Sequence, residues 1–177
     1  SLPKALEAAE HRLALEGDRL GAAEIRDGLR TTLIVVIGSP DQVGFCYIGD
    51  GGGVVVRSAG ETERFLEPQK VSADFPNLLA ASLGPRREGE PISGTFRRRR
   101  GELILVGTDG VFDRVDGEFP LEVLRGSMRL KGDLRAAAHQ VLEELAAFHD
   151  EAGYVCDDNM TLGLMGLGAP LSPKVEN

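Results

Sequence analysis

Three aspartates lie at the ends of segments whose apolar, β-branched composition is typical of strands. Asp50 and Asp109 each follow such a segment, and Asp158 precedes one that begins near Met160. If that last strand runs antiparallel to the other two, all three carboxylates reach the same edge of the sheet layer. Carboxylates about 4 Å apart repel by roughly 4 kcal/mol at an effective dielectric of about 20, so a cluster of this kind persists only with a compensating cation, a proton or wide spacing.

The oxygen donors of this cluster determine the chemistry that it would support. Carboxylate oxygens are hard ligands that favour Mg²⁺ or Mn²⁺, whereas Zn²⁺ prefers histidine and cysteine. Bound divalent ions lower the pKa of a coordinated water and hold the oxygens of a transferring phosphoryl group. The sequence has no Gly-x-Ser-x-Gly elbow, no Walker-type loop and no cysteine in a phosphate-binding loop. The pattern therefore favours hydrolysis by a metal-activated water, which needs no side-chain nucleophile.

Each aspartate also has a simpler interpretation, because aspartate followed by glycine or asparagine is typical of turns. The chain contains three such pairs: Asp50-Gly51, Asp109-Gly110 and Asp158-Asn159. The run Gly51–Gly53 lacks the Lys-Ser/Thr of a phosphate-binding loop and is typical of a tight hairpin. The turn and metal-site interpretations both remain open at this point.

The elements that would position these residues are short strands between a few helices. Asp133 is a suitable N-cap for the clearest helix, which has one apolar stripe at helical spacing. Helices are expected over residues 3–16, 76–83, 119–124 and 134–151, and strands over 31–38, 43–49, 53–58, 92–98, 102–107 and from 160 onward. Hairpin-linked strands without β-α-β alternation predict an α+β fold with antiparallel sheets.

Two features of this order carry specific expectations. Residues 92–98 and 102–107 are expected to pair as a hairpin that turns near Arg100. The run Arg97–Arg100 is then either the solvated end of that hairpin or a landing patch for phosphate or an acidic partner. The three histidines lie in predicted helices without ligand spacing and are expected at the surface or half-buried: His11, His139 and His149.

Composition limits the class of protein. The chain has 177 residues, of which 42% are hydrophobic and 27% charged, as in one ordinary globular domain. A formal net charge of −8 argues against a nucleic-acid surface. The sequence contains no apolar run long enough to span a bilayer. Cys46 and Cys156 form no ligand spacing or disulfide framework, which favours the cytoplasm.

Three signatures, which occur in the right order, and one further segment resemble the type 2C (PPM) metal-dependent protein serine/threonine phosphatases. TTLIVVIG with FCYIGDGGGVVVR is similar to the family's Thr-rich strand and its Val-Gly-Asp-Ser-Arg hairpin. LILVGTDGVFD is similar to the Ser-Asp-Gly-Leu-Trp-Asp strand end, and DDNMTLGLM to the terminal Asp-Asn strand. NLLAASLG resembles the stretch before the second hairpin. The resemblance implies a phosphatase-like domain over residues 1–168, with a frayed tail over 169–177.

This resemblance implies an antiparallel β-sandwich flanked by helices, in which Mg²⁺ or Mn²⁺ activates water against phosphoserine and phosphothreonine in proteins. Asp109 and Asp158 would be ligands of a binuclear centre, and Asp50 would contribute to a further, weaker metal position. Three neighbours would support these ligands: Asp113, Asn159 and Gly110. A phosphoprotein substrate is implied, and a cognate serine/threonine kinase is a possible partner.

The chain also departs from the family. The family's N-terminal Arg, Glu-Asp pair and Asp-Gly-His-Gly-Gly motif are not found, so its N-terminal strands are expected to be missing, and Gly51 and Gly52 replace the hairpin's Ser and Arg. Because the first residue is Ser1 and not Met, the sequence is compatible with a piece of an active phosphatase. A non-catalytic pseudophosphatase that binds a partner, and a small interaction module whose aspartates only form turns, are the alternatives.

Overall fold

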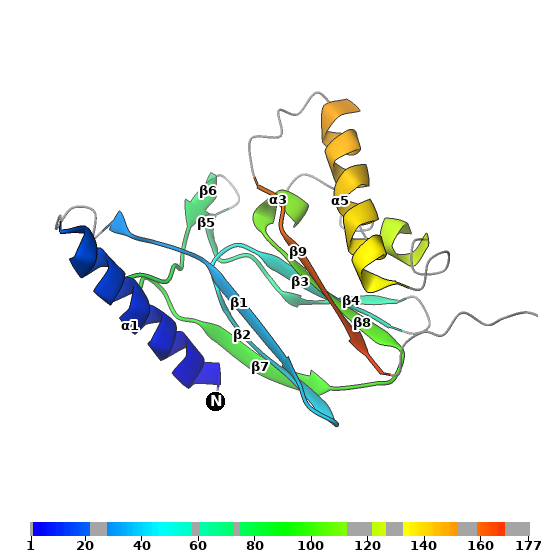
Figure 1. The fold of residues 1–177 in the computed structure, drawn as a ribbon, viewed down its shortest axis with the longest axis horizontal. Coiled ribbons are helices and arrows are strands. Elements are labelled where there is room, and N and C mark those ends of the chain that lie inside the picture. The colour runs from blue at the N-terminus through cyan, green and yellow to red at the C-terminus, as the bar shows by residue number, and fades with distance from the viewer. Residues whose placement is uncertain are drawn as a thin grey trace, which may run out of the picture. The chain divides into compact units, whose positions relative to one another are not determined.

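A computed structural model describes residues 2–21, 28–57, 61–72, 75–112, 122–126, 133–151 and 159–168. The chain forms two compact units (Figure 1). The first unit combines Ser1–Asp50 with Pro68–Arg98, and the second combines Gly51–Glu67 with Arg99–Asn177. The expected tail, residues 169–177, lies outside the described residues.

The first unit is built on a three-stranded antiparallel sheet in the order β1-β2-β7, with one helix, α1, along it (Figure 1). The apolar side of α1 packs on one face of the sheet, where Leu6 is buried with Cys46 and Ile48. Two further strands, β5 and β6, form a separate antiparallel pair. The elements are α1 (Leu2–Leu20), β1 (Leu33–Gly38), β2 (Gln42–Ile48), β5 (Lys70–Ser72), β6 (Phe75–Leu79) and β7 (Ile92–Arg97).

The second unit contains a four-stranded antiparallel sheet in the order β4-β3-β8-β9. Helix α5 lies along β9 (Figure 1), and its buried Val141 and Leu145 join Leu105 of β8 in one apolar cluster. The elements are β3 (Gly52–Val56), β4 (Thr62–Leu66), β8 (Glu102–Gly107), α3 (Asp109–Phe112), α5 (Leu134–Glu151) and β9 (Leu162–Leu167).

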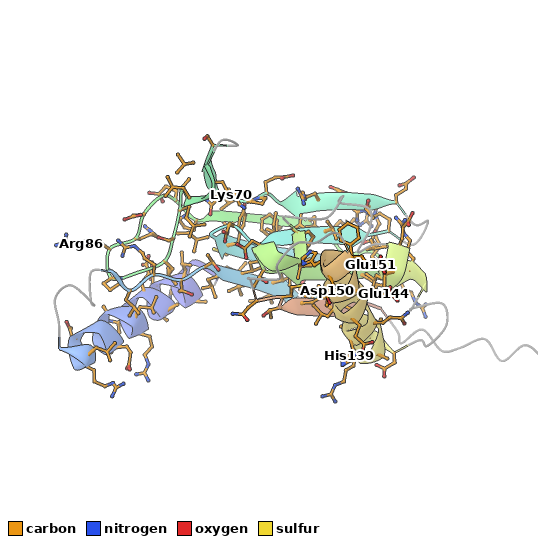
Figure 2. All side chains as sticks on the ribbon, turned by 90° about the horizontal axis from the view of Figure 1, so that it is seen from above. Lys70, Arg86, His139, Glu144, Asp150 and Glu151 are labelled. Carbon is orange, nitrogen blue, oxygen red and sulfur yellow. The ribbon has the colours of Figure 1, made fainter. Side chains whose placement is uncertain are left out.

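Helix α5 confirms the prediction for residues 134–151, including its cap. The Asp133 carboxylate accepts a hydrogen bond from the Arg135 backbone N–H at 2.9 Å, as an N-cap residue does. The outward face of the helix carries polar and acidic side chains, labelled in Figure 2: His139, Glu144, Asp150 and Glu151. The predicted α+β class with antiparallel sheets and few helices is confirmed.

His149 differs from its expected position, because its side chain is only 3% exposed. It lies four and eight residues after Leu145 and Val141 and therefore continues the buried face of α5. His11 and His139 are exposed, as predicted. Among the described residues, no helix is both long enough and apolar enough to cross a membrane.

Two predicted hairpins are wrong. Strands β7 and β8 do not pair with each other, because β7 pairs with β2 while β8 lies between β3 and β9. The Gly51–Gly53 run is not a hairpin turn either, since β2 and β3 belong to different sheets. Sequence neighbours predict a strand's partner only when a turn reverses the chain locally. The arginine run is thus not a hairpin end, and Arg98 donates to the carbonyl oxygen of Ser39 at 2.9 Å.

The helix predicted over residues 76–83 is also wrong, since residues 75–79 form strand β6. Leu79 lies opposite Lys70 of β5, and the Ala80 N–H donates to the carbonyl oxygen of Gln69 at 2.8 Å. Leu83 then bridges to Thr31. These pairings satisfy backbone groups that a helix of eight residues would satisfy only in part, because its first four N–H and last four C=O groups lack partners. Of the helix predicted over residues 119–124, the structure describes residues 122–124, which are helical, and the helical conformation continues to residue 126.

One buried ion pair lies at the end of β8 away from Asp109. The Glu102 carboxylate, with 1% of its side chain exposed, accepts a hydrogen bond from Arg57 at 2.8 Å. Arg57 follows β3 and also pairs with the exposed Glu63. Both carboxylates raise the pKa of Arg57, with Glu102 contributing most. The buried carboxylate of Glu102 is therefore neutralised by Arg57 at this end of the second unit's sheet.

We expect Glu102→Ala to lower the free energy of unfolding by about 3–5 kcal/mol, because it leaves the Arg57 guanidinium largely buried without its main partner. The matched control is Glu63→Ala on the same arginine. Glu63 is 62% exposed, so its loss should cost less than about 1 kcal/mol. Urea unfolding followed by circular dichroism measures both changes. Equal costs for the two variants would contradict the assignment.

Candidate metal site

Asp109 lies immediately beyond the end of β8 and begins the short helix α3. Its carboxylate is half-buried, and its Oδ1 accepts a hydrogen bond from the Gly110 N–H at 3.0 Å. Val111 and Phe112, which follow Gly110, are buried in the core of the second unit. The backbone of Asp109 is therefore held between a strand and buried side chains while its side chain stays within reach of solvent.

Strand β9 runs antiparallel to β8, as the sequence argument required. Gly107 lies opposite Leu162, so the chain entering β9 reaches the same edge as Asp109. Thr108 extends the pairing beyond the strands, since its N–H donates to the Thr161 carbonyl oxygen at 3.1 Å. Asn159, which follows Asp158 in the chain, thus lies beside the Asp109 turn. Asp158 itself and Asp113 lie outside the described residues.

Gly110 contacts the same segment from the other side of Asp109. A Cβ atom added at Gly110 would lie 3.0 Å from the carbonyl oxygen of Asn159 and 3.3 Å from Cγ of Met160. A side chain here would push the two segments apart, so glycine permits the close approach. The structure thus places Gly110 and Asn159 beside Asp109, while their predicted supporting role for a metal stays a prediction.

The glycines at the start of β3 accommodate the α3 turn. A Cβ atom at Gly52 would lie 2.6 Å from the ring of Phe112, and one at Gly53 would lie 2.8 Å from Leu66. Both glycines are buried. The side chain that the related hairpin motif carries at position 52 would therefore overlap Phe112. Packing, and not a tight turn, accounts for this glycine pair.

Asp50 belongs to the first unit, where it follows β2 and is half-buried. The preceding Gly49 has φ 122°, and a Cβ atom there would lie 2.3 Å from the Thr32 side chain. Two hydrogen bonds join Gln69 to Gly49. The side-chain Oε1 of Gln69 accepts from the Gly49 N–H at 2.8 Å, and the backbone N–H of Gln69 donates to the Gly49 carbonyl oxygen at 2.9 Å. The backbone at Asp50 is thus fixed by neighbours that glycine alone tolerates.

Sequence reasoning missed Thr108, Gln69 and Phe112. A hydroxyl residue before Asp109 was visible in the motif, but its partners lie more than fifty residues away. Gln69 carried no signal, because it lies in an irregular segment. Within the described ranges, no three His, Cys, Asp or Glu side chains form a metal-binding group. The structure brings Asp109, Gly110 and Asn159 together in the second unit.

Comparison with known proteins identifies the family. The family model for protein phosphatase 2C matches residues 2–160. The chain belongs to the protein phosphatase 2C family. Protein phosphatase PhpP of Streptococcus pneumoniae is 24% identical over 89% of the chain and 67% of its own length. A rice (Oryza sativa subsp. japonica) protein named as a protein phosphatase 2C is 27% identical over 50% of the chain, which spans only 27% of that relative's length.

Solved phosphatase structures share the fold. The Mycobacterium tuberculosis serine/threonine phosphatase PstP matches with a TM-score of 0.75 and 22% identity, over 94% of this chain and 72% of that one. The PstP catalytic domain in complex with two manganese ions matches with a TM-score of 0.70 and 22% identity, over 92% and 69% of the two chains. The arrangement of strands described above is therefore that of protein phosphatase 2C domains.

We expect Gly52→Ala to destabilise the second unit by about 1–3 kcal/mol, because the added methyl group overlaps the Phe112 ring. Gly126→Ala is the matched control, since a Cβ atom at Gly126 meets nothing within 4 Å. It should leave stability unchanged or slightly higher. Thermal unfolding measures both variants. Combining Gly52→Ala with Phe112→Leu should recover part of the loss, and strictly additive costs would contradict the proposed contact.

Proposed function

We propose that the protein hydrolyses phosphoserine and phosphothreonine in other proteins, using water activated by Mg²⁺ or Mn²⁺. The observation that carries this proposal is the pairing of β8 with β9, which brings the chain after Asp158 beside Asp109. Membership of the protein phosphatase 2C family supports it. We further propose that residues 1–168 act as part of a catalytic domain, with a serine/threonine kinase producing the phosphoprotein that it consumes.

The donor chemistry fits a hard divalent cation. The proposed ligands are all aspartates, and Asp109 keeps its carboxylate half-buried with one described hydrogen bond, from Gly110. Asp109 and Asp158 would hold the principal metal ions, and Asp50 would contribute to a further position. When bound, the metal would supply Lewis acidity and an acidified water. The manganese ions of the PstP catalytic domain support this class of metal.

The residues of this chain have distinct tasks in the proposal. Asp109 supplies a carboxylate on a backbone that β3 and β9 hold through β8. The Gly110 N–H orients that carboxylate by donating to Oδ1. Asn159 would hold Asp158, and Asp113 would assist at the strand-end motif. Because water is the proposed nucleophile, no serine, cysteine or histidine side chain needs to attack phosphorus.

Asp109→Asn should lower manganese-dependent hydrolysis of p-nitrophenyl phosphate by at least about 100-fold, because losing a metal ligand should cost no less than losing a ligand's supporting partner. Asp150→Asn is the matched control, since Asp150 lies on the exposed face of α5. Its turnover should equal that of the unmodified protein. Initial rates at saturating Mn²⁺ test the pair, and unchanged turnover in Asp109→Asn would refute the site.

Adding Mn²⁺ to metal-free protein should raise the melting temperature. A ligand at 100 times its dissociation constant stabilises the native state by about 2.7 kcal/mol, which corresponds to roughly 5–11 °C for a chain of this size. The shift should be much smaller in Asp109→Asn. Differential scanning calorimetry with and without chelator provides the measurement. The interpretation in which the aspartates only form turns predicts no shift in either protein.

A further inference from the structure

We infer that Thr108 is a positioning residue that sets the spacing between Asp109 and the chain segment bearing Asp158. This inference rests on the proposed function, because it assigns a role within the same site. It concerns the hydroxyl group of Thr108, whose two described hydrogen bonds go to backbone groups. The role is to hold two acidic segments at a separation that a shared pair of cations can bridge.

The Thr108 hydroxyl bonds to two backbone groups of the neighbouring segment. Its Oγ1 donates to the carbonyl oxygen of Asn159 at 2.9 Å and accepts from the N–H of Thr161 at 3.0 Å. The ladder between β8 and β9 begins at the pair Gly107 and Leu162, so both bonds lie beyond its end. The hydroxyl therefore continues the pairing to the residue that directly follows Asp158.

A second contact brings the same segment close to Asp109 from the other side. Gly110 approaches the Asn159 carbonyl so closely that an added Cβ atom would lie 3.0 Å from its oxygen. Thr108 and Gly110 flank Asp109 on either side in the chain. The Asn159 carbonyl thus lies against both chain neighbours of Asp109, bonded to the Thr108 hydroxyl and closely packed on Gly110.

Repulsion between the carboxylates of the proposed site explains why the Thr108 hydrogen bonds would matter for metal binding. Carboxylates that converge on one cation repel each other before it binds. Beyond the ladder, the segment would otherwise be held by the bond from the Thr108 N–H to the Thr161 carbonyl oxygen, and strand ends are the least protected part of a sheet. Removing the hydroxyl would leave the Asn159 carbonyl and the Thr161 N–H without a partner on Thr108. The acidic segments could then separate in the metal-free protein and would have to be reassembled on binding.

The test uses Thr108→Val, which keeps the side-chain shape but removes the hydroxyl, and Thr108→Ser, which keeps the hydroxyl. Thr95→Val, at an exposed position of β7 in the first unit, is the matched control. Titration calorimetry measures Mn²⁺ affinity, and amide hydrogen exchange measures protection of residues 159–161 in metal-free protein. We expect Thr108→Val to bind Mn²⁺ about 10–100-fold more weakly, with on the order of tenfold faster exchange at Thr161.

Thr108→Ser and Thr95→Val should both retain the affinity of the unmodified protein. Gly110→Ala provides a second route, because it displaces Asn159 while the hydroxyl remains; it should also weaken Mn²⁺ binding. Unchanged affinity and exchange in Thr108→Val would overturn the inference, as would equal losses in the Ser and Val variants. If the unmodified protein binds no Mn²⁺ and lacks turnover, the proposed function itself fails. The two failures are therefore distinguishable.

Discussion

Acidic side chains that must share a cation repel one another until it arrives, so the backbone that carries them has to be held by other interactions. In the proposed site this constraint would fall on β8, which is hydrogen-bonded to β3 on one side and β9 on the other. Its two ends carry the buried Glu102, compensated by Arg57, and Asp109. A central strand resists displacement because both neighbours would have to move with it.

The glycine run before and within β3 shows how packing and the site depend on each other. Phe112 follows Asp109 by three residues, and its ring occupies the space that a side chain at position 52 would need. The α3 turn can therefore press against the sheet only if β3 begins with glycine. In the sequence, Gly51 and Gly52 replace the Ser and Arg of the family hairpin. At Gly52, the replacement matches the packing of the turn that carries Asp109.

Most elements could be predicted from local patterns, whereas their partners could not. Helix α5 has an apolar stripe at helical spacing and a capping aspartate, and both signals depend only on neighbouring residues. Strands β7 and β8 were recognised, but the sequence does not indicate which strand lies beside either of them, and the apolar residues of β8 leave neither of its faces polar. The helix expected over residues 76–83 failed because pairing with β5 satisfied the backbone instead.

The surroundings of Asp109 were predictable to the same extent. Asp109 could be selected because it ends a strand, but the neighbours that hold it are set by the register of β8 and β9, in which Gly107 lies opposite Leu162. A slip of one residue would turn every β9 side chain to the opposite face and would move Asn159 away from Thr108. Residues 108 and 159 are joined by a hydrogen bond across 51 positions in the chain. Short motifs therefore identify the acidic residues, while the sheet register determines whether they can act together.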